Sequence, residues 1–505
     1  MKNKPNRKGL DTEEKKEEKN MKYEIEAKPY GSYDVVVCGG GTAGCMAAIA
    51  SARQGAKTLL IERSFTVGGM LTVGEAGITK FTEHCKDVDK YKKEVLDVLA
   101  TEPKKVQVVG GIAHEYVKRM IDGGAALATH GEAGSYVFTD KAEAQWTLIQ
   151  MLDEAGVTVL YDTRAVLVKK GGDKVTGVVV TNKEGFCEID AKVVIDATGD
   201  GDVCALAGAS FNLGATEQEV KDGFGRYVGD TQSFGTMYRV NGVDFERLFD
   251  YFEQFPQNFV VHQFGVMSFD DVKESYRSGQ MCVFRIHDLN YCFDNAWDNI
   301  QIYNLPEKGG AIILGRDCGY TDKTEHSGLN AGALSRGQYS LQKGARVLTD
   351  ALKKYVPGFE NVQITYVPEV GVRESRHIIG EYMLSASDVM TGKDFPDSIA
   401  CGGHPLDISP LPPDIHPEKF NFNHWRFHIP YRIMLPKGVD GLLVTGRCVS
   451  ASRGASGAIR PTAQCMAMGE AAGVAAAMAV KGSVTPKNID IAELRRILTE
   501  NGGII

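Results

Sequence analysis

The hydrophobic pattern of the chain first becomes regular at residues 33–61. Residues 33–38 (YDVVVC) form a continuous apolar run, which is typical of a strand buried on both faces of a parallel sheet. Three glycines follow, and then a stretch of small residues that predicts a helix packed closely on the sheet and ending near Gly55. Residues 58–61 form a second apolar strand. This alternation predicts a βαβ unit.

The rest of the chain contains segments that we expect to join the same sheet and segments that we expect to form a separate domain. We expect the sheet to be continued by a helix at 141–154, strands near 157–160, 165–169, 174–181 and 192–196, a late strand at 441–445 and an alanine-rich helix at 461–480. The intervening sequence is richer in aromatic and mixed polar residues and includes a helix near 328–355. The predicted fold class is α/β, with a discontinuous Rossmann-like domain and an inserted α+β substrate domain. The expected boundaries are a disordered charged tail at 1–29, the Rossmann-like domain at 30–210 and 436–485, the substrate domain at 211–435 and a C-terminal extension at 486–505.

Composition and charge limit the classes of molecule that the protein is expected to bind. Lys and Arg number 57 against 65 Asp and Glu, a net charge of −8, so no general basic surface for nucleic acid is expected. The eleven cysteines include no C-x-x-C pair, which favours reduced thiols and argues against zinc fingers, iron–sulfur clusters and redox dithiols. The longest apolar stretch, 471–480, is shorter than the roughly 20 residues of a membrane span. We therefore expect a soluble, cytoplasmic protein with no membrane partner and no metal site.

A nucleotide-binding motif stands between the first strand and the first helix. Residues 39–44 contain G-x-G-x-x-G, in which Gly39 would make the turn, Gly41 would let a pyrophosphate approach and Gly44 would let the helix pack on the strand. The helix N-terminus would offer free N–H groups to the pyrophosphate. Glu62 ends the second strand, where its carboxylate can accept hydrogen bonds from an adenosine ribose. The alternative is a glycine turn without a ligand, and the motif alone does not distinguish NAD from FAD.

Three distant segments point to the larger of these cofactors. Residues 63–70 include a glycine pair that would let the backbone pass close to an extended ligand, and residues 196–202 cap a buried strand with small side chains. Gly446 ends the last strand, and residues 454–462 lead into the final helix with a proline in its first turn. Together with the first motif, these segments favour FAD.

The same segments resemble those of a known family. The chain is similar to the FAD-dependent oxidoreductase family of the glutathione-reductase-like flavoprotein superfamily, which is related to fumarate-reductase-like and tRNA-uridine-modifying flavoproteins. The resemblance extends over about residues 33–480 and rests on DVVVCGGGTAGCMAAIASARQGAKTLLIER, GGM, VVIDATGDGDVCALAG, GVRESRHIIGEY and GLLVTGRCVSASRGASGAIRPTAQCMAMGEAAGVAAA. It implies a Rossmann-like FAD-binding domain of glutathione-reductase type, with FAD as cofactor. No histidine stands at 64–69, where fumarate-reductase relatives with covalent flavin carry one, so the FAD is expected to be non-covalent.

The resemblance also implies a set of cofactor contacts. In such proteins the first segment binds the pyrophosphate and ribose, the A-T-G segment abuts the cofactor, and the final helix points its N-terminus at the flavin ring. Backbone groups at 458–463 should surround the pyrimidine edge of the ring, where the helix field stabilises negative charge, and Ala165 or Val166 should contact adenine. Many superfamily members have Gly-Asp after the last strand, whereas this chain has Gly446-Arg447, as is common in the narrower family. The expected cofactor-binding residues are Gly39, Gly41, Thr42, Ala43, Gly44, Glu62, Arg63, Gly68, Gly69, Met70, Ala165, Val166, Ala197, Thr198, Gly199, Asp202, Gly446, Arg447, Ala458, Ile459, Arg460, Thr462 and Ala463.

Two clusters offer the acid–base groups that flavin chemistry on a C–H or C=C bond requires. Arg373 and His377 are four residues apart, so they would share a face in a helix or in a strand. The guanidinium would hold a carboxylate or keto oxygen while the imidazole moved a proton; the alternative is a buried Arg–Glu network that links the two domains. His404 lies in a glycine-rich loop, either as a catalytic group oriented by Asp407 or as part of a structural turn. The expected catalytic residues are Arg373, His377 and His404.

The expected activity is that of a dehydrogenase or reductase that transfers a hydride between a small organic substrate and FAD. No second G-x-G-x-x-G follows a buried strand, so a separate electron donor or acceptor is expected. Two alternatives stay open. One is an electron-transfer component of a larger complex, which the missing iron–sulfur motif disfavours, and the other is an RNA-modifying flavoprotein, which the negative charge disfavours. A homo-oligomer also stays open.

Overall fold

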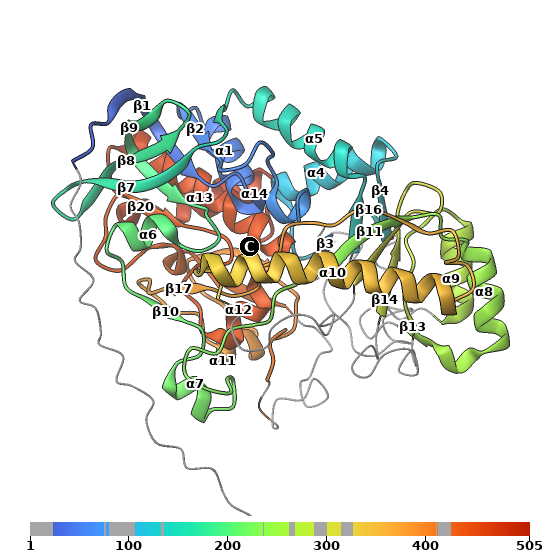
Figure 1. Ribbon diagram of the computed structural model, residues 1–505. Helices are drawn as coiled ribbons and strands as arrows, with labels where there is room; N and C mark the ends of the chain where they lie inside the picture. The colour runs from blue at the N-terminus through green and yellow to red at the C-terminus, as the bar shows by residue number, and fades with distance from the viewer. Residues whose placement is uncertain are drawn as a thin grey trace, which may run out of the picture.

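Two bodies, each with its own sheet and its own hydrophobic core, make up the described part of the chain. The computed structural model describes residues 24–74, 77–79, 107–132, 136–235, 237–261, 268–286, 300–314, 327–410, 412 and 426–505. Helix α10 (Ala331–Tyr355) runs along both bodies in Figure 1. Most of the charged tail expected at 1–29 lies outside the described residues.

A seven-stranded sheet forms the centre of the first body, in the order β6-β2-β1-β9-β8-β7, with β20 also paired to β9. Its strands are β1 (Lys28–Cys38), β2 (Thr58–Ile61), β6 (Thr158–Leu160), β7 (Arg164–Gly171), β8 (Lys174–Asn182), β9 (Gly185–Asp196) and β20 (Leu442–Val444). Strands β6, β2, β1, β9 and β20 run parallel, and β8 and β7 continue the sheet antiparallel. The ends of four parallel strands meet in register at Cys38, Ile61, Asp196 and Val444. Ligands of such sheets bind outside this carboxyl edge.

Two helices rich in small residues cross closely beside this sheet. They are α1 (Thr42–Arg53), which lies between β1 and β2 in sequence, and α13 (Thr462–Gly482). A Cβ atom on Gly469 would lie 2.2 Å from the carbonyl oxygen of Ala43, and one on Gly473 would lie 2.2 Å from that of Ala47. The alanine-rich composition of α13 therefore allows its backbone to touch that of α1. Helix α13 is long and apolar enough to cross a membrane, but 83% of its most apolar window is buried in the protein, as in a core helix.

The second body is an antiparallel sheet covered by helices. Its six strands, in the order β12-β13-β14-β15-β11-β16, are β11 (Met237–Asn241), β12 (Phe259–Val261), β13 (Val283–Ile286), β14 (Ile300–Asn304), β15 (Ala311–Leu314) and β16 (Gln363–Tyr366). Helices α8 (Phe245–Gln254) and α9 (Phe269–Arg277) pack on this sheet through an aromatic core. The rings of Phe252 and Phe284, for example, meet edge to face at 5.7 Å.

The core of the first body extends further along the chain than the sequence predicts. It includes Ile378, Ile399, Phe427 and Tyr431, all within the segment 211–435 that the sequence assigns to the substrate domain. Aromatic-rich composition does not reveal on which core a segment packs, and this part packs beside α13. The remaining elements are α4 (Gly111–Asp122), α5 (Lys141–Glu154), α6 (Asp202–Leu206), α7 (Glu217–Lys221), α11 (Ala386–Met390), α12 (Arg453–Ile459), α14 (Ile491–Glu500), β3 (Ile78–Thr79), β4 (Ala126–Glu132), β5 (Tyr136–Thr139), β10 (Phe211–Leu213), β17 (Arg376–Ile378), β18 (Ser398–Gly402) and β19 (Phe427–Pro430). The C-terminal extension joins the same core through Leu494 and Leu498 of α14.

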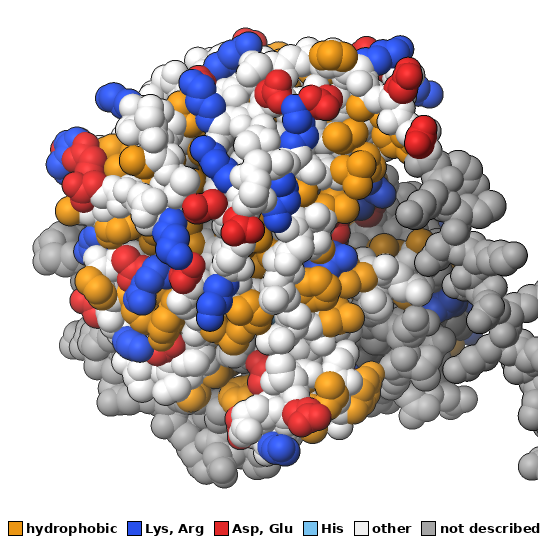
Figure 2. All heavy atoms as spheres, turned by 90° about the vertical axis from the view of Figure 1, so that its left-hand side faces the viewer, with side chains coloured by type: hydrophobic (Ala, Val, Ile, Leu, Met, Phe, Trp, Pro, Cys, Tyr) orange, Lys and Arg blue, Asp and Glu red, His pale blue; other side chains and the backbone are white. Residues whose placement is uncertain are grey.

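One face of the surface and the described cysteines show how charges and thiols are distributed. Figure 2 shows basic and acidic side chains interspersed over the outer face of the first body. The eight cysteines among the described residues are all buried, and none of them forms a disulfide.

Candidate active site

A cavity of about 480 Å³ opens at the carboxyl edge of the parallel sheet. We call it the sheet-edge cavity. It is lined by the ends of β1, β2, β9 and β20, by the start of α13 and by residues of the second body. Of the residues predicted from sequence, those lining it are Gly39, Gly41, Thr42, Ala43, Glu62, Arg63, Gly69, Met70, Ala165, Ala197, Thr198, Gly199, Asp202, Arg373, His404, Gly446, Arg447, Arg460 and Thr462. Segments more than 400 residues apart in sequence therefore meet around one space.

The three glycines of the first motif have different surroundings. Gly39 has φ +102°, and a Cβ there would lie 2.6 Å from the carbonyl oxygen of Ala197. A Cβ on Gly44 would lie 1.8 Å from the carbonyl oxygen of Gly39, so this glycine lets α1 pack on β1. A Cβ on Gly41 would meet no atom within 4 Å. Gly39 and Gly44 are thus required by protein packing, whereas Gly41 faces open space in the cavity.

A second glycine turn braces the first. The N–H of Gly68 donates to the carbonyl oxygen of Gly40 at 2.8 Å, and the hydroxyl of Thr42 donates to the carbonyl oxygen of Gly68 at 3.2 Å. Gly68 and Gly69 both have positive φ, which only glycine adopts readily. Gly69 lines the cavity, whereas Gly68 packs against Thr72 on the protein side.

The carboxylate of Glu62 ties the end of β2 to the glycine turn. Its Oε2 accepts from the N–H of Gly40 at 2.6 Å, and its Oε1 accepts from the N–H of Ser64 at 2.8 Å. Each carboxylate oxygen has two lone-pair sites, so both can still accept from a ribose hydroxyl. The residue therefore combines a structural role with the ligand contact that the sequence suggests.

We expect Glu62→Ala to weaken FAD binding by about ten- to a hundredfold, because each lost bond to a carboxylate contributes about 1.5–3 kcal/mol. The measurement is the dissociation constant of FAD for the apoprotein, from flavin fluorescence. Glu62→Gln, which keeps one acceptor oxygen, is the matched control and should lose less affinity. Unchanged affinity in the alanine variant would remove Glu62 from the cofactor site.

Asp196, which the sequence did not single out, organises the turn after β9. Its side chain is fully buried, and burial raises its pKa. One oxygen accepts from the N–H and hydroxyl of Thr198, at 3.1 and 2.7 Å, and the other accepts from the N–H of Cys204 at 2.8 Å. These bonds hold Ala197, Thr198 and Gly199 at the cavity wall. An aspartate that ends an apolar strand is the signal that could have identified it.

The positive charge of Arg447, which follows β20, is compensated by an ion pair. The Arg447 guanidinium donates to Oδ1 of Asp200 at 2.8 Å and to the hydroxyl of Ser375 at 2.8 Å. Burial opposes ionisation of Asp200, but the Arg447 guanidinium holds the pKa of this carboxyl below its usual range. Asp200 lies in the turn after β9 and lines the same cavity.

At the final helix, the cavity lining includes some of the residues that were predicted to contact the cofactor. Arg460 and Thr462 line the cavity, together with Pro461 and Cys465, so the N-terminal end of α13 faces it. The side chains of three other predicted residues, Ala458, Ile459 and Ala463, are fully buried and are not part of the lining. Helix α12 packs its whole length into the core, which turns the first two of these side chains inward. Gly44, Gly68 and Val166 are likewise outside the lining, and Ala165 is inside it.

Arg373 and His377 lie in two different environments. Arg373 lines the cavity, whereas His377 is only 3% exposed and shares a hydrogen bond of 3.1 Å with Glu374. Glu374 also accepts from Arg453 at 3.2 Å and from the N–H of Gln232 at 2.8 Å. His377 therefore belongs to the buried network that was the alternative interpretation. This is contrary to the shared face expected from the spacing, because β17 begins at Arg376 and Arg373 lies in the irregular segment before it.

His404 lies at the cavity wall, in the loop that follows β18. The structure places its Nδ1 2.7 Å from the carbonyl oxygen of Pro405, and because a carbonyl only accepts, Nδ1 carries the proton. In the neutral ring Nε2 is then the basic nitrogen. The carboxylate of Asp407 accepts from Arg460 at 2.5 Å. The contact that orients Nδ1 is thus the Pro405 carbonyl.

Apolar and aromatic side chains, which the sequence did not identify, complete the cavity. Met237, Tyr303 and Leu314 of the second body line it beside Phe138 of β5. The rings of Phe138 and Tyr303 lie 4.7 Å apart. Only the packing of β5 against the second body brings these side chains together, so no local signal could have shown them.

A family model described as FAD dependent oxidoreductase matches residues 34–498. The chain belongs to this family. The predicted family, the α/β fold class with a parallel sheet and FAD as the cofactor of an oxidoreductase are confirmed. The residues around the sheet-edge cavity fit such a cofactor, because Gly41 leaves open space beside the helix N-terminus and Glu62 keeps lone pairs for a ribose.

Curated relatives match only part of the chain. It is 31% identical over 185 residues to digeranylgeranylglycerophospholipid reductase of Methanocaldococcus jannaschii, covering 35% of this chain and 40% of that protein. It is 27% identical over 203 residues to NADH:fumarate oxidoreductase of Klebsiella pneumoniae, covering 33% of this chain and 20% of that protein. The matches thus span two fifths or less of the length of these relatives. Among solved structures, a geranylgeranyl bacteriochlorophyll reductase-like protein of Thermoplasma acidophilum is 15% identical with a TM-score of 0.43, over 93% of this chain and 84% of that one.

Proposed function

We propose that this chain is a dehydrogenase or reductase that transfers a hydride between a small organic substrate and non-covalent FAD. The observation that carries the proposal is the sheet-edge cavity, which is lined both by the cofactor segments and by Arg373, His404 and an apolar wall from the second body. Bound FAD supplies the hydride acceptor or donor. The remaining chemistry falls to side chains of the chain.

Five arginines and one imidazole are among the polar side chains of the cavity. Arg373 has the planar fork that binds a carboxylate or keto oxygen, and His404 can take up or release a proton at Nε2. Arg460 lies at the start of α13, where the helix field also favours negative charge. Arg447 is paired with Asp200, so its role is to hold the wall in place.

The apolar wall supports a substrate that has a hydrocarbon part beside its polar group. Phe138, Tyr303, Met237 and Leu314 would bury that part, while Arg373 binds the polar end. The relatives are named as reductases of a lipid and of fumarate, two organic molecules. A separate electron donor or acceptor and a cytoplasmic location belong to the same proposal.

The thiols at the cavity support a non-covalent flavin. Burial raises the pKa of Cys465 to about 12 and the pKa of Cys38 well above its usual value, so both remain protonated and weakly nucleophilic. We expect acid precipitation of the yellow protein to release all of its flavin into the supernatant, measured by absorbance. Flavin that stays with the precipitated chain would contradict this expectation.

Anaerobic reduction tests the function itself. The purified protein is photoreduced without oxygen and then mixed with candidate organic oxidants, and the oxidised protein is mixed with candidate reductants. We expect one class of organic oxidant to restore the oxidised spectrum of the photoreduced flavin, or one class of organic reductant to bleach the oxidised flavin. Either change should occur within the time of a turnover. Exchange of electrons only with another redox protein would instead favour the electron-transfer alternative.

A further inference from the structure

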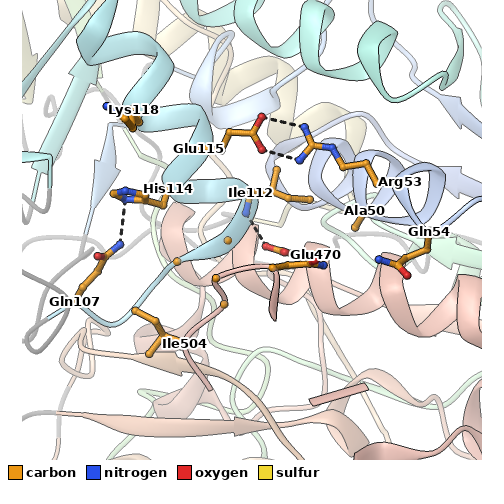
Figure 3. A pocket seen from close by; sticks show the side chains of 15 residues that line it. Ala50, Arg53, Gln54, Gln107, Ile112, His114, Glu115, Lys118, Glu470 and Ile504 are labelled. Carbon is orange, nitrogen blue, oxygen red and sulfur yellow. Dashed lines mark hydrogen bonds and ion pairs between the residues drawn. The ribbon is translucent and has the colours of Figure 1, made fainter. Parts of the chain in front are cut away.

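A second cavity, of about 700 Å³, lies away from the carboxyl edge of the sheet. We call it the α4 cavity. Its walls are the last turn of α1, the first half of α4 with the residues before it, Glu470 of α13, and residues 501–504 after α14. Figure 3 shows these segments around the space. None of the residues predicted to bind FAD or substrate lines it.

Glu470 is an incompletely bonded acid in this cavity. Its side chain is 3% exposed, and its Oε2 accepts from the N–H of Ile112 at 2.9 Å, in the first turn of α4 (Figure 3). Its Oε1 is buried and has no hydrogen-bond partner within the described residues. A buried carboxylate oxygen without a partner is costly, and one free N–H donor would relieve that cost.

The other ionisable groups of the cavity leave Glu470 without a compensating cation. Arg53 of α1 donates to both oxygens of Glu115, at 2.6 and 3.0 Å, and Lys118 pairs with Asp122 at 3.0 Å. The ring of His114 contacts Gln107 at 3.2 Å. Residues 501–504 carry no ionisable side chain. Arg119 also donates to Glu115 at 2.8 Å, so Glu115 and Asp122 have cationic partners, whereas no ion pair joins Glu470 to a cation within the described residues.

We propose that the α4 cavity binds a small organic cation whose ammonium or guanidinium N–H donates to Oε1 of Glu470. An anion would meet the Glu470 carboxylate, and the positive charge of Arg53 is already paired with both oxygens of Glu115. The amide oxygens of Gln54 and Asn501, which line the same space, can accept further N–H groups of the ligand. The proposal adds a site to the protein and is independent of the redox function.

Protonation of Glu470 gives the site a pH dependence. Burial raises the pKa of Glu470 to about 7, so the folded state keeps this proton while the unfolded chain has lost it. The contribution of Glu470 to stability therefore falls as the pH rises from the ordinary value of 4.5 to about 7. A cation requires the ionised form, so it should bind more tightly as the pH rises through this range and should release a proton when it binds below the pKa.

The test uses the full-length, FAD-loaded protein and simple probes. Butylammonium and butylguanidinium chloride are compared with butan-1-ol and butyrate by saturation-transfer NMR, and affinities are measured by calorimetry. We expect the two cations alone to bind saturably. Their affinity should fall by about tenfold or more in Glu470→Gln, because the new amide keeps an oxygen for the N–H of Ile112 but presents a donor to the cation. Glu217→Gln removes one exposed carboxylate on α7 and should bind like the wild type.

A second measurement does not depend on any variant. Calorimetry of the wild-type protein in buffers with different ionisation enthalpies, from about pH 6 to about pH 8, should show proton release that disappears at the upper end. Equal binding of butan-1-ol, undiminished binding in Glu470→Gln, or affinity that does not change with pH would each overturn the proposal. Binding of none of the probes would overturn the proposal as well.

Discussion

Gly41→Val should abolish flavin retention while leaving the fold intact. Gly41 has φ −75°, and a side chain there would point into open space at the sheet-edge cavity without touching protein. It would instead occupy the space through which the pyrophosphate approaches the helix N-terminus. Valine at the start of α1 should lower the free energy of unfolding by only about 1 kcal/mol, because β-branched residues cap helices poorly. The measurements are bound flavin per chain and the thermal midpoint of the apoprotein.

Gly44→Val is the matched contrast for this variant. Its Cβ would lie 1.8 Å from the carbonyl oxygen of Gly39, so the variant should lose both flavin and stability. A Gly41→Val protein that retains its flavin would move the pyrophosphate away from this turn. A large loss of stability in Gly41→Val would mean that the space beside Gly41 is not open.

His404→Ala should slow the exchange of hydride with substrate by about a hundredfold or more, which is typical of the loss of a general acid or base. The flavin spectrum should stay nearly unchanged, because His404 lies in the loop after β18 and not in the glycine turns. Stopped-flow absorbance with the substrate found by anaerobic screening measures this rate. A normal rate would leave the loop after β18 with only a structural role.

His377, which the sequence also predicted to be catalytic but which is buried in the structure, provides the control. His377→Gln can keep a hydrogen bond to Glu374, and the residue is not part of the cavity lining. We expect a lower thermal midpoint in this variant with a rate close to that of the wild type. A rate as low as that of His404→Ala would restore His377 to the catalytic groups.

The elements that the sequence predicted well are those whose signal is local. Strand β2 and helix α5 have the predicted bounds, and the βαβ unit and the final helix lie within a few residues of the prediction. Apolar runs and glycine turns are set by the residues themselves, because a strand buried on both faces must be apolar and a positive φ favours glycine. The cofactor segments were predictable for the same reason.

The tertiary structure decided where side chains point and which residues they contact. The spacing of Arg373 and His377 fits a shared face, but Arg373 lines the cavity from the segment before β17, whereas His377 lies in a buried network. The Arg447–Asp200 pair joins residues 247 positions apart, and the orphaned oxygen of Glu470 exists only because α13 meets the start of α4. The sequence by itself determined the nucleotide-binding fold, since this depends on local periodicity and glycine geometry, and its three further segments indicated FAD. The tertiary structure decided which polar groups face a cavity, because that depends on contacts between segments far apart in the chain.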